Sequence, residues 1–294
     1  MRRIGIVVAA VLAAGALAAP AASAADASAA EASASTHQNR SDLLVLGSNG
    51  VLSRHNGNQP VVVEHRVRIT GLAHHDRLVG MDVRPANGTV YVIGASGQLY
   101  TVDAKSGKAT KVGAPVALTG RAVGLDFNPT VDRIRLVTDT GQNLRLHPDT
   151  GAVAAVDSTL AYATGGGRPE VAASGYTNSV AGATSTALYG LDSRTDTLVL
   201  QGSVPGATPV VSPNTGQLFP VGRLGLNVVA TNGFDIDGAA RAGDYDAKDY
   251  RAVAAVRTGG LLGLSLLVDV NLDTGRAKVL APLLTPPVGV AFIG

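Results

Sequence analysis

The chain has 294 residues and no cysteine, which excludes disulfide bonds, thiolate metal sites and a cysteine nucleophile. Its 24 basic and 22 acidic residues give a net charge of only +2, and Arg2 and Arg3 account for that excess. A chain this close to neutral lacks the electrostatic footprint that nucleic acids or anionic membranes would require, so neither is expected as a partner.

Residues 1–24 have the pattern of a signal peptide. Arg2 and Arg3 precede an apolar run, and Ala22-Ser23-Ala24 provides a small-residue cleavage site. The run is too short for a membrane span, and no second long apolar segment follows it. We therefore expect a secreted, extracellular protein with no membrane attachment after cleavage. Residues 25–41, rich in alanine and serine, are expected to be a disordered spacer.

The remaining residues, 42–294, are predicted to form a single domain that begins with three strands. Alternating or β-branched runs at 43–46, 50–53 and 61–69 carry this signal. No glycine-containing strand precedes these three strands, although such a strand opens each later unit. The last copy of that strand, at 288–293, stands alone at the end of the chain. The two ends together would therefore complete one sheet.

A repeat runs along the domain, and self-similarity of this kind indicates a repeated structural unit. Residues 78–85 (LVGMDVRP) match residues 122–129 (AVGLDFNP), and looser copies follow. Each copy contains an anchor glycine: Gly80, Gly124, Gly175, Gly233 and Gly289.

Each of the first four copies is followed by a polar pair and a second glycine, which predicts a hairpin turn. Between the anchor and the turn lie short β-branched or aromatic runs, and no amphipathic helix is evident. The turn glycines are Gly107, Gly151, Gly216 and Gly275.

This pattern predicts an all-β fold, a β-propeller of about five blades with four short antiparallel strands each. The ring would be closed by joining the N- and C-terminal strands in one blade, which removes exposed sheet edges. In copies three and four the anchor glycine and the turn glycine are farther apart, which indicates insertions of about fifteen residues. Six blades remain open as an alternative if an insertion hides a divergent unit.

Three segments of the repeat are similar to the bacterial domain-of-unknown-function 4394 family, a group of exported, propeller-like proteins. They are residues 123–135, 139–145 and 188–192 (LYGLD). The similarity covers residues 42–294, is most specific at 121–151, and weakens beyond Gly238. It implies a propeller fold and export, and the family has no established activity or catalytic residues to carry over.

Aspartates two residues after three of the anchor glycines form the first candidate site. On a strand they share a face with the glycine and recur around the ring axis. Carboxylates in a ring are suitable ligands for Ca²⁺, the one candidate cofactor. Hydrogen bonds from these aspartates to the next blade would explain their recurrence equally well. The candidate metal ligands are Asp82, Asp126 and Asp235, with Thr177 and Ala291 at the equivalent positions of the other copies.

Two further polar segments are candidate ligand-binding sites. One lies in the best-preserved repeat, where arginines and amides could bind a sugar or peptide, or could pair across strands instead. The other is an acidic and aromatic insertion at 243–250, expected to cover one mouth of the channel. The candidate ligand-binding residues are Asp126, Asn128, Asp132, Arg133, Arg135, Asp235, Asp237, Asp244, Asp246 and Asp249.

No catalytic motif is present in the sequence, so no catalytic residue is predicted. The expected function is therefore that of a secreted, non-catalytic binding or scaffold domain, a monomer whose partner is a small molecule, a glycan or a protein. The alternative is an extracellular propeller hydrolase or lactonase that uses a cation and carboxylates at the central channel. Convergence of acidic side chains in one pocket would favour the alternative.

Overall fold

The computed structural model describes residues 40–238 and 245–293. The predicted signal peptide at 1–24, nearly all of the predicted spacer and the candidate residue Asp244 lie outside these residues. The described part forms a compact unit of its own, built from short strands with two single-turn 3₁₀ helices. Among the described residues, none lies in a helix long and apolar enough to span a membrane.

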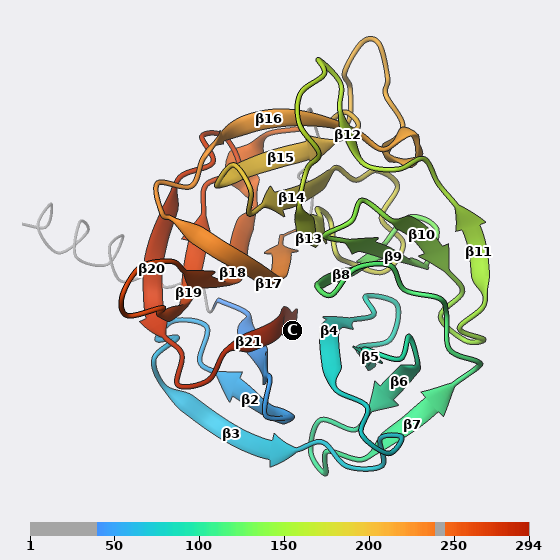
Figure 1. The fold of residues 1–294 in the computed structure, drawn as a ribbon, viewed down its shortest axis with the longest axis vertical. Helices are drawn as coiled ribbons and strands as arrows, with labels where there is room; N and C mark the ends of the chain where they lie inside the picture. The colour runs from blue at the N-terminus through green and yellow to red at the C-terminus, as the bar shows by residue number, and fades with distance from the viewer. Residues whose placement is uncertain (1–39, 239–244, 294) are drawn as a thin grey trace, which may run out of the picture. The chain divides into compact units, whose positions relative to one another are not determined.

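Five sheets surround a common axis, as Figure 1 shows, so the all-β, five-bladed prediction is confirmed. Blade 1 uses both ends of the domain: β21 (Pro287–Ile293), β1 (Asp42–Gly47), β2 (Val51–His55) and β3 (Val63–Arg68). Blade 2 contains β4 (Leu78–Val83), β5 (Val90–Gly94), β6 (Leu99–Val102) and β7 (Ala109–Val112). Blade 3 contains β8 (Val123–Asn128), β9 (Arg133–Thr138), β10 (Asn143–Leu146) and β11 (Val153–Val156).

The other two blades carry the insertions. Blade 4 contains β13 (Val171–Tyr176), β14 (Leu188–Asp192), β15 (Thr197–Gln201) and β16 (Gln217–Arg223). A short fifth strand, β12 (Ala161–Tyr162), pairs in parallel with β16 and was not predicted. Blade 5 contains β17 (Val228–Asp237), β18 (Arg251–Thr258), β19 (Ser265–Val270) and β20 (Ala277–Pro282). The 3₁₀ turns are η1 (Pro213–Thr215) and η2 (Ala247–Asp249).

The strand pairings are antiparallel within every four-stranded blade. In blade 1 the last strand, β21, pairs with β1 over nearly its whole length, from Asp42 opposite Ile293 to Gly47 opposite Pro287. The innermost strands are β4, β8, β13, β17 and β21, and each contacts its two neighbours around the axis. All five anchor glycines lie on these inner strands.

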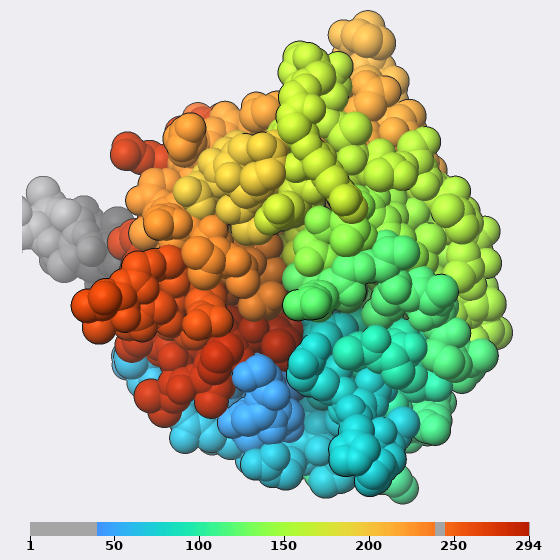
Figure 2. All heavy atoms as spheres, viewed as in Figure 1, coloured from blue at the N-terminus to red at the C-terminus, as the bar shows by residue number. Residues whose placement is uncertain are grey.

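Apolar side chains fill each seam between adjacent blades. In the described residues the buried apolar side chains form five clusters, each shared by two neighbouring blades. The seam of blades 2 and 3, for example, packs Ile93 and Tyr91 against Phe127. Because both faces of a blade are covered, a strand such as β5 is buried along its full length. Figure 2 shows the atoms of adjacent blades abutting around the axis.

The four predicted turn glycines lie in turns with left-handed backbone. The φ angles of Gly107, Gly151, Gly216 and Gly275 are 73°, 67°, 69° and 76°. This conformation is open to glycine and strained for residues with a Cβ. The sequence therefore located the outer turns of blades 2, 3 and 5 correctly, whereas in blade 4 Gly216 is the C-cap of η1 at the end of a longer connection between β15 and β16.

Candidate functional site

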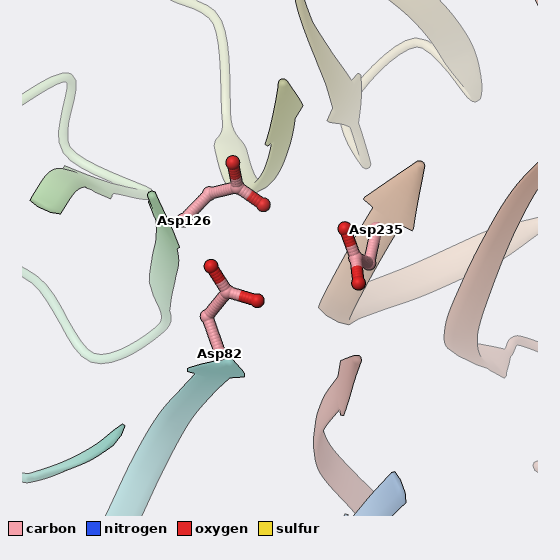
Figure 3. A group of neighbouring side chains, drawn as sticks. All are labelled: Asp82, Asp126 and Asp235. Carbon is pink, nitrogen blue, oxygen red and sulfur yellow. The ribbon is translucent and has the colours of Figure 1, made fainter. Parts of the chain in front are cut away.

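Three aspartates meet on the axis of the ring. Asp82 on β4, Asp126 on β8 and Asp235 on β17 point toward one another in Figure 3. One carboxylate oxygen from each lies within 4.8 Å of the other two. The three residues are 4%, 1% and 4% exposed, so this is a buried cluster. We call it the central carboxylate cluster.

Each aspartate of the cluster also connects its blade to the next one. Asp82 Oδ2 accepts the main-chain N–H of Phe127 at 2.7 Å. Asp126 Oδ1 accepts that of Tyr176 at 2.9 Å, and Asp235 Oδ2 accepts that of Phe292 at 2.7 Å. The alternative role considered from the sequence, a hydrogen bond to the following blade, is therefore present at all three positions.

These hydrogen bonds correct the alignment of blade 4. Asp82 bonds to the residue after Asp126, and Asp126 bonds to Tyr176, the residue after Gly175. In both bonds the N–H belongs to the residue that follows the aligned position. Gly175, which precedes Tyr176, therefore occupies the aspartate position on β13. Thr177, the residue that the sequence repeat put there, lies two residues further along the chain. In blade 4 the glycine itself occupies the aspartate position, so the lag of two residues from anchor glycine to aspartate does not hold on β13. Ala291 is correctly placed, since Asp235 bonds to Phe292.

Burial dominates the electrostatics of the cluster. It raises the pKa of Asp82 and of Asp126 well above the ordinary aspartate value, and repulsion from neighbouring carboxylates raises both further. Burial also raises the pKa of Asp235, to about 6, although two main-chain N–H groups oppose the shift. Among the described residues, no Lys or Arg forms an ion pair with these carboxylates. Three neighbouring charges of one sign require a proton or a cation between them.

A pocket of about 350 Å³ lies at one mouth of the channel, above the cluster. Its polar lining includes Asp82, Asp235, Asp237, Ser179 and Arg84. Arg84 donates to Asp132 at 2.8 Å and to Asp149 at 2.7 Å, so this cation is held by blade 3. Sequence reasoning missed Arg84, although its place two residues after Asp82, just past the end of β4, was a usable signal.

The polar cluster of blade 3 is an internal network. Arg135 is 1% exposed and donates to Tyr176, Asn143, Asp157 and Asn214, the last two at 2.5 and 2.7 Å. These bonds use four of its five N–H groups, so the buried Arg135 serves to join blades 3 and 4.

The other candidates of blade 3 also have local partners. Asn128 accepts from Thr130 in the following turn, and Asp132 pairs with Arg84. Arg133 donates to the carbonyls of Val131 and Asp132. These side chains lie apart from the central carboxylate cluster, to which only Asp126 of this group belongs.

The described part of the acidic insertion packs on blade 4. Tyr245 and Tyr250 stack with ring centres 5.6 Å apart, and their hydroxyls bond to Tyr189 and Asn178. Asp246 caps η2 by accepting the N–H of Lys248. None of the described residues 245–250 lines the pocket over the cluster, whereas Asp235 and Asp237 do.

The cluster has suitable dimensions for a calcium ion. Ca²⁺ binds oxygen ligands at about 2.3 to 2.6 Å, so oxygens on opposite sides of one ion lie about 5 Å apart. The three oxygens, all within 4.8 Å of one another, satisfy that limit. Asp82, Asp126 and Asp235 would hold the ion. Its remaining coordination positions would face the pocket, where water or a ligand would fill them.

Two comparisons with known sequences give a family and no characterised relative. The sequence model of one family, described as Domain of unknown function (DUF4394), matches residues 51–291. No curated protein matches the chain.

Solved structures with a similar fold are distant in sequence. A structural genomics protein of unknown function from Bacteroides thetaiotaomicron is 14% identical with a TM-score of 0.51, covering 88% of this chain and 66% of that one. An auxiliary nutrient binding protein from Bacteroides ovatus is 13% identical with a TM-score of 0.46, covering 83% and 55%. The chain thus spans between 55% and 66% of the length of these structures. The likeness concerns the fold alone.

Proposed function

This chain belongs to the family of the domain of unknown function DUF4394, and from that premise we propose that it is a secreted binding or scaffold module with a calcium ion at the mouth of its channel. The ion would bind the central carboxylate cluster, and a small oxygen-bearing molecule such as a sugar would bind the ion from the pocket. The observation that carries the proposal is the convergence of three buried carboxylates below that pocket.

The coordination chemistry of calcium links the ion to a ligand. Ca²⁺ takes about six to eight oxygen ligands, more than three carboxylates supply if each binds through one oxygen. Asp82 and Asp235 line the pocket, so the open positions of the ion would face it. A ligand with neighbouring hydroxyls would replace water there. The apolar ring of Phe292 and the side chain of Ser179 would contact its other atoms.

The test is a calcium titration of the purified protein after removal of divalent ions. Calcium is expected to raise the melting temperature, since an ion that binds only the folded state at 100 times its dissociation constant stabilises it by about 2.7 kcal/mol. In Asp126→Asn the amide oxygen keeps the bond to Tyr176, but one charge of the site is lost. This variant is expected to lose the calcium response. Isothermal titration calorimetry would count the ions bound.

The control is Asp273→Asn, which removes an exposed carboxylate from a turn on the outer side of blade 5. It is expected to respond to calcium like the parent protein. A flat response of the parent protein, or an equal response of Asp126→Asn, would be evidence against the calcium site.

A channel hydrolase or lactonase is the second candidate, favoured by the same convergence of acidic side chains in one pocket. Every aspartate of the cluster is also bound to a main-chain N–H, which suits a fixed ligand set better than a group that must exchange protons. Assay of a lactone panel with and without calcium distinguishes the two. Calcium-dependent turnover that is lost in Asp126→Asn would establish the hydrolase.

A further inference from the structure

A second pocket, of about 410 Å³, lies where blade 1 meets the end of blade 5. Its walls are apolar, from Val45, Val51, Val61, Val63, Leu283 and Leu284. Polar residues also line it: Ser53 and His55 on β2, Arg66 on β3, and Asn49 and Thr285 in turns. An apolar pocket with a few convergent polar groups is the usual form of a small-molecule site.

Hydrogen bonds fix the tautomer of His55. Its Nδ1 lies 2.7 Å from the carbonyl oxygen of Pro60, which can only accept, so Nδ1 carries the proton. The other nitrogen, Nε2, is then an acceptor, and it lies 3.0 Å from the hydroxyl of Ser53. The competing acceptor for that hydroxyl, the carbonyl of Val45, is farther away at 3.2 Å. The Ser53 hydroxyl thus lies within donating distance of two acceptors, the Val45 carbonyl and Nε2 of a neutral imidazole whose far side is held by Pro60.

This arrangement is that of a nucleophile and its base. A serine hydroxyl is activated when an imidazole within hydrogen-bond distance can take its proton and another group orients the ring. Here the Pro60 carbonyl does the orienting. His55 is 5% exposed, and its burial lowers its pKa; the bond to the Pro60 carbonyl opposes this shift, and the charge of Arg66 adds to it. The ring is thus kept neutral at neutral pH, in the form that accepts a proton.

Arg66 supplies a positive charge beside the hydroxyl. It is directly opposite Ser53 in the β2–β3 register, and side chains so paired have Cβ atoms about 4.5 to 5.5 Å apart. Within the described part of the chain, Arg66 has no hydrogen bond or ion pair. A guanidinium so placed can stabilise negative charge that develops on a substrate oxygen.

We propose that this pocket is a hydrolytic site in which Ser53 is the nucleophile, His55 the general base and Arg66 the group that stabilises the oxyanion. The apolar walls select carboxylic esters with an apolar acyl group. The site is separate from the channel, shares no residue with the central carboxylate cluster, and stands or fails independently of calcium binding.

The reaction balances with these groups and water. Ser53 Oγ forms a bond to the ester carbonyl carbon while its proton passes to His55 Nε2, and the carbonyl oxygen becomes negative beside Arg66. The bond from that carbon to the alcohol oxygen then breaks, and the imidazolium returns the proton to the departing alcohol. A water molecule, deprotonated by His55, attacks the acyl-serine. This step releases the carboxylic acid and restores Ser53.

An alkyl fluorophosphonate probe tests the nucleophile directly on the full chain. The serine oxygen would bond to phosphorus, fluoride would leave, and the serine proton would pass through His55 to solvent. We expect one adduct per protein molecule, assigned to Ser53 by peptide mass spectrometry and absent from Ser53→Ala. His55→Gln is expected to react about 100-fold more slowly because the base is lost. p-Nitrophenyl butyrate hydrolysis should fall in parallel.

Matched controls lie beside the site on exposed positions. Ser48→Ala in the β1–β2 turn and His65→Gln on β3 should react like the parent protein. The side chain of Arg66 is exposed, so Arg66→Gln should leave the core intact. This variant should be labelled about 100-fold more slowly. An unlabelled Ser53 in the folded parent protein, or equal labelling rates for His55→Gln and His65→Gln, would overturn the proposal.

Discussion

Each channel aspartate serves the fold and is available to a cation. One main-chain N–H from the next blade occupies an oxygen of Asp82, Asp126 and Asp235. A hydrogen bond to a charged acceptor contributes about 1.5 to 3 kcal/mol to stability. The carboxylates are nonetheless buried together, which opposes their ionisation. The cluster is therefore stable with protons or with a cation, and strained when both are absent.

This conflict predicts an unusual dependence of stability on pH. A carboxyl with a raised native pKa holds its proton in the native state after the unfolded chain has lost it, so its contribution to stability falls as pH rises through the native pKa. For Asp235 the fall extends from about pH 4 through about 6. In chelator, the unfolding free energy should decrease by about 1 kcal/mol between pH 5 and 7.5 from this residue alone.

Scanning calorimetry in chelator across that range measures the effect, as a drop of about 3 °C in melting temperature for a domain of this size. Asp126→Asn should reduce the slope, because one of the mutually repelling carboxyls is gone. A melting temperature that stays constant or climbs from pH 5 to 7.5 would be inconsistent with the raised pKa values.

At the level of elements, the outer turns also join neighbouring blades. Gly275, between β19 and β20, has φ of 76°, and a Cβ there would lie 2.3 Å from the carbonyl oxygen of Gly222 on β16. Its place thus requires glycine for two reasons, the backbone angle and the close approach of blade 4. The sequence pattern revealed only the first reason.

Gly275→Ala is accordingly expected to destabilise the protein by about 3 kcal/mol or more, the sum of a strained φ and a steric clash. The matched control is Gly88→Ala, where φ is 70° but nothing lies within 4 Å of the added Cβ. It should lose only about 1 kcal/mol. Urea unfolding curves give both values, and equal losses would show that contact between blades adds nothing at this turn.

How far the sequence predicted the elements differs from blade to blade. Residues 143–146 are β10 as expected, because blade 3 has no insertion and its apolar alternation is regular. In blade 4 the glycine pattern misplaced the alignment at Gly175, because a glycine stands where three other copies carry an aspartate, and only the bond from Tyr176 to Asp126 reveals this. The strand β12 has only two residues, and each pairs with a residue 56 positions later in the chain, which no local sequence pattern can indicate.

At the level of the whole molecule, blade 1 depends on both ends of the domain. β21 pairs with β1, and its Phe292 donates its N–H to Asp235 of blade 5. Val290 and Phe292 also pack in the seam with Val253. The last strand therefore contributes to one sheet, one seam and the support of the central carboxylate cluster.

Deletion of residues 287–294 should consequently affect the entire ring. Without β21, β1 loses its partner, the seam of blades 5 and 1 opens to water, and a free sheet edge is exposed. We expect loss of the cooperative melting transition and concentration-dependent aggregation, measured by calorimetry and light scattering. The comparison is Val279→Thr, a half-exposed position on the outer strand β20, which should melt like the parent protein. A truncated chain that melts cooperatively near the parent temperature would disprove this dependence.

The sequence by itself determined the fold class, a count of about five blades, the outer turns of blades 2, 3 and 5, and the three aspartates, because each is encoded by a local pattern that recurs along the chain. Only the tertiary structure decided which groups meet. It brought residues 82, 126 and 235 within 4.8 Å, tied Arg135 to blade 4, and placed Pro60 and Arg66 around Ser53 and His55. Such contacts depend on how the blades turn about the axis and on where a bulge shifts a strand, and neither is visible in the order of residue types along the chain.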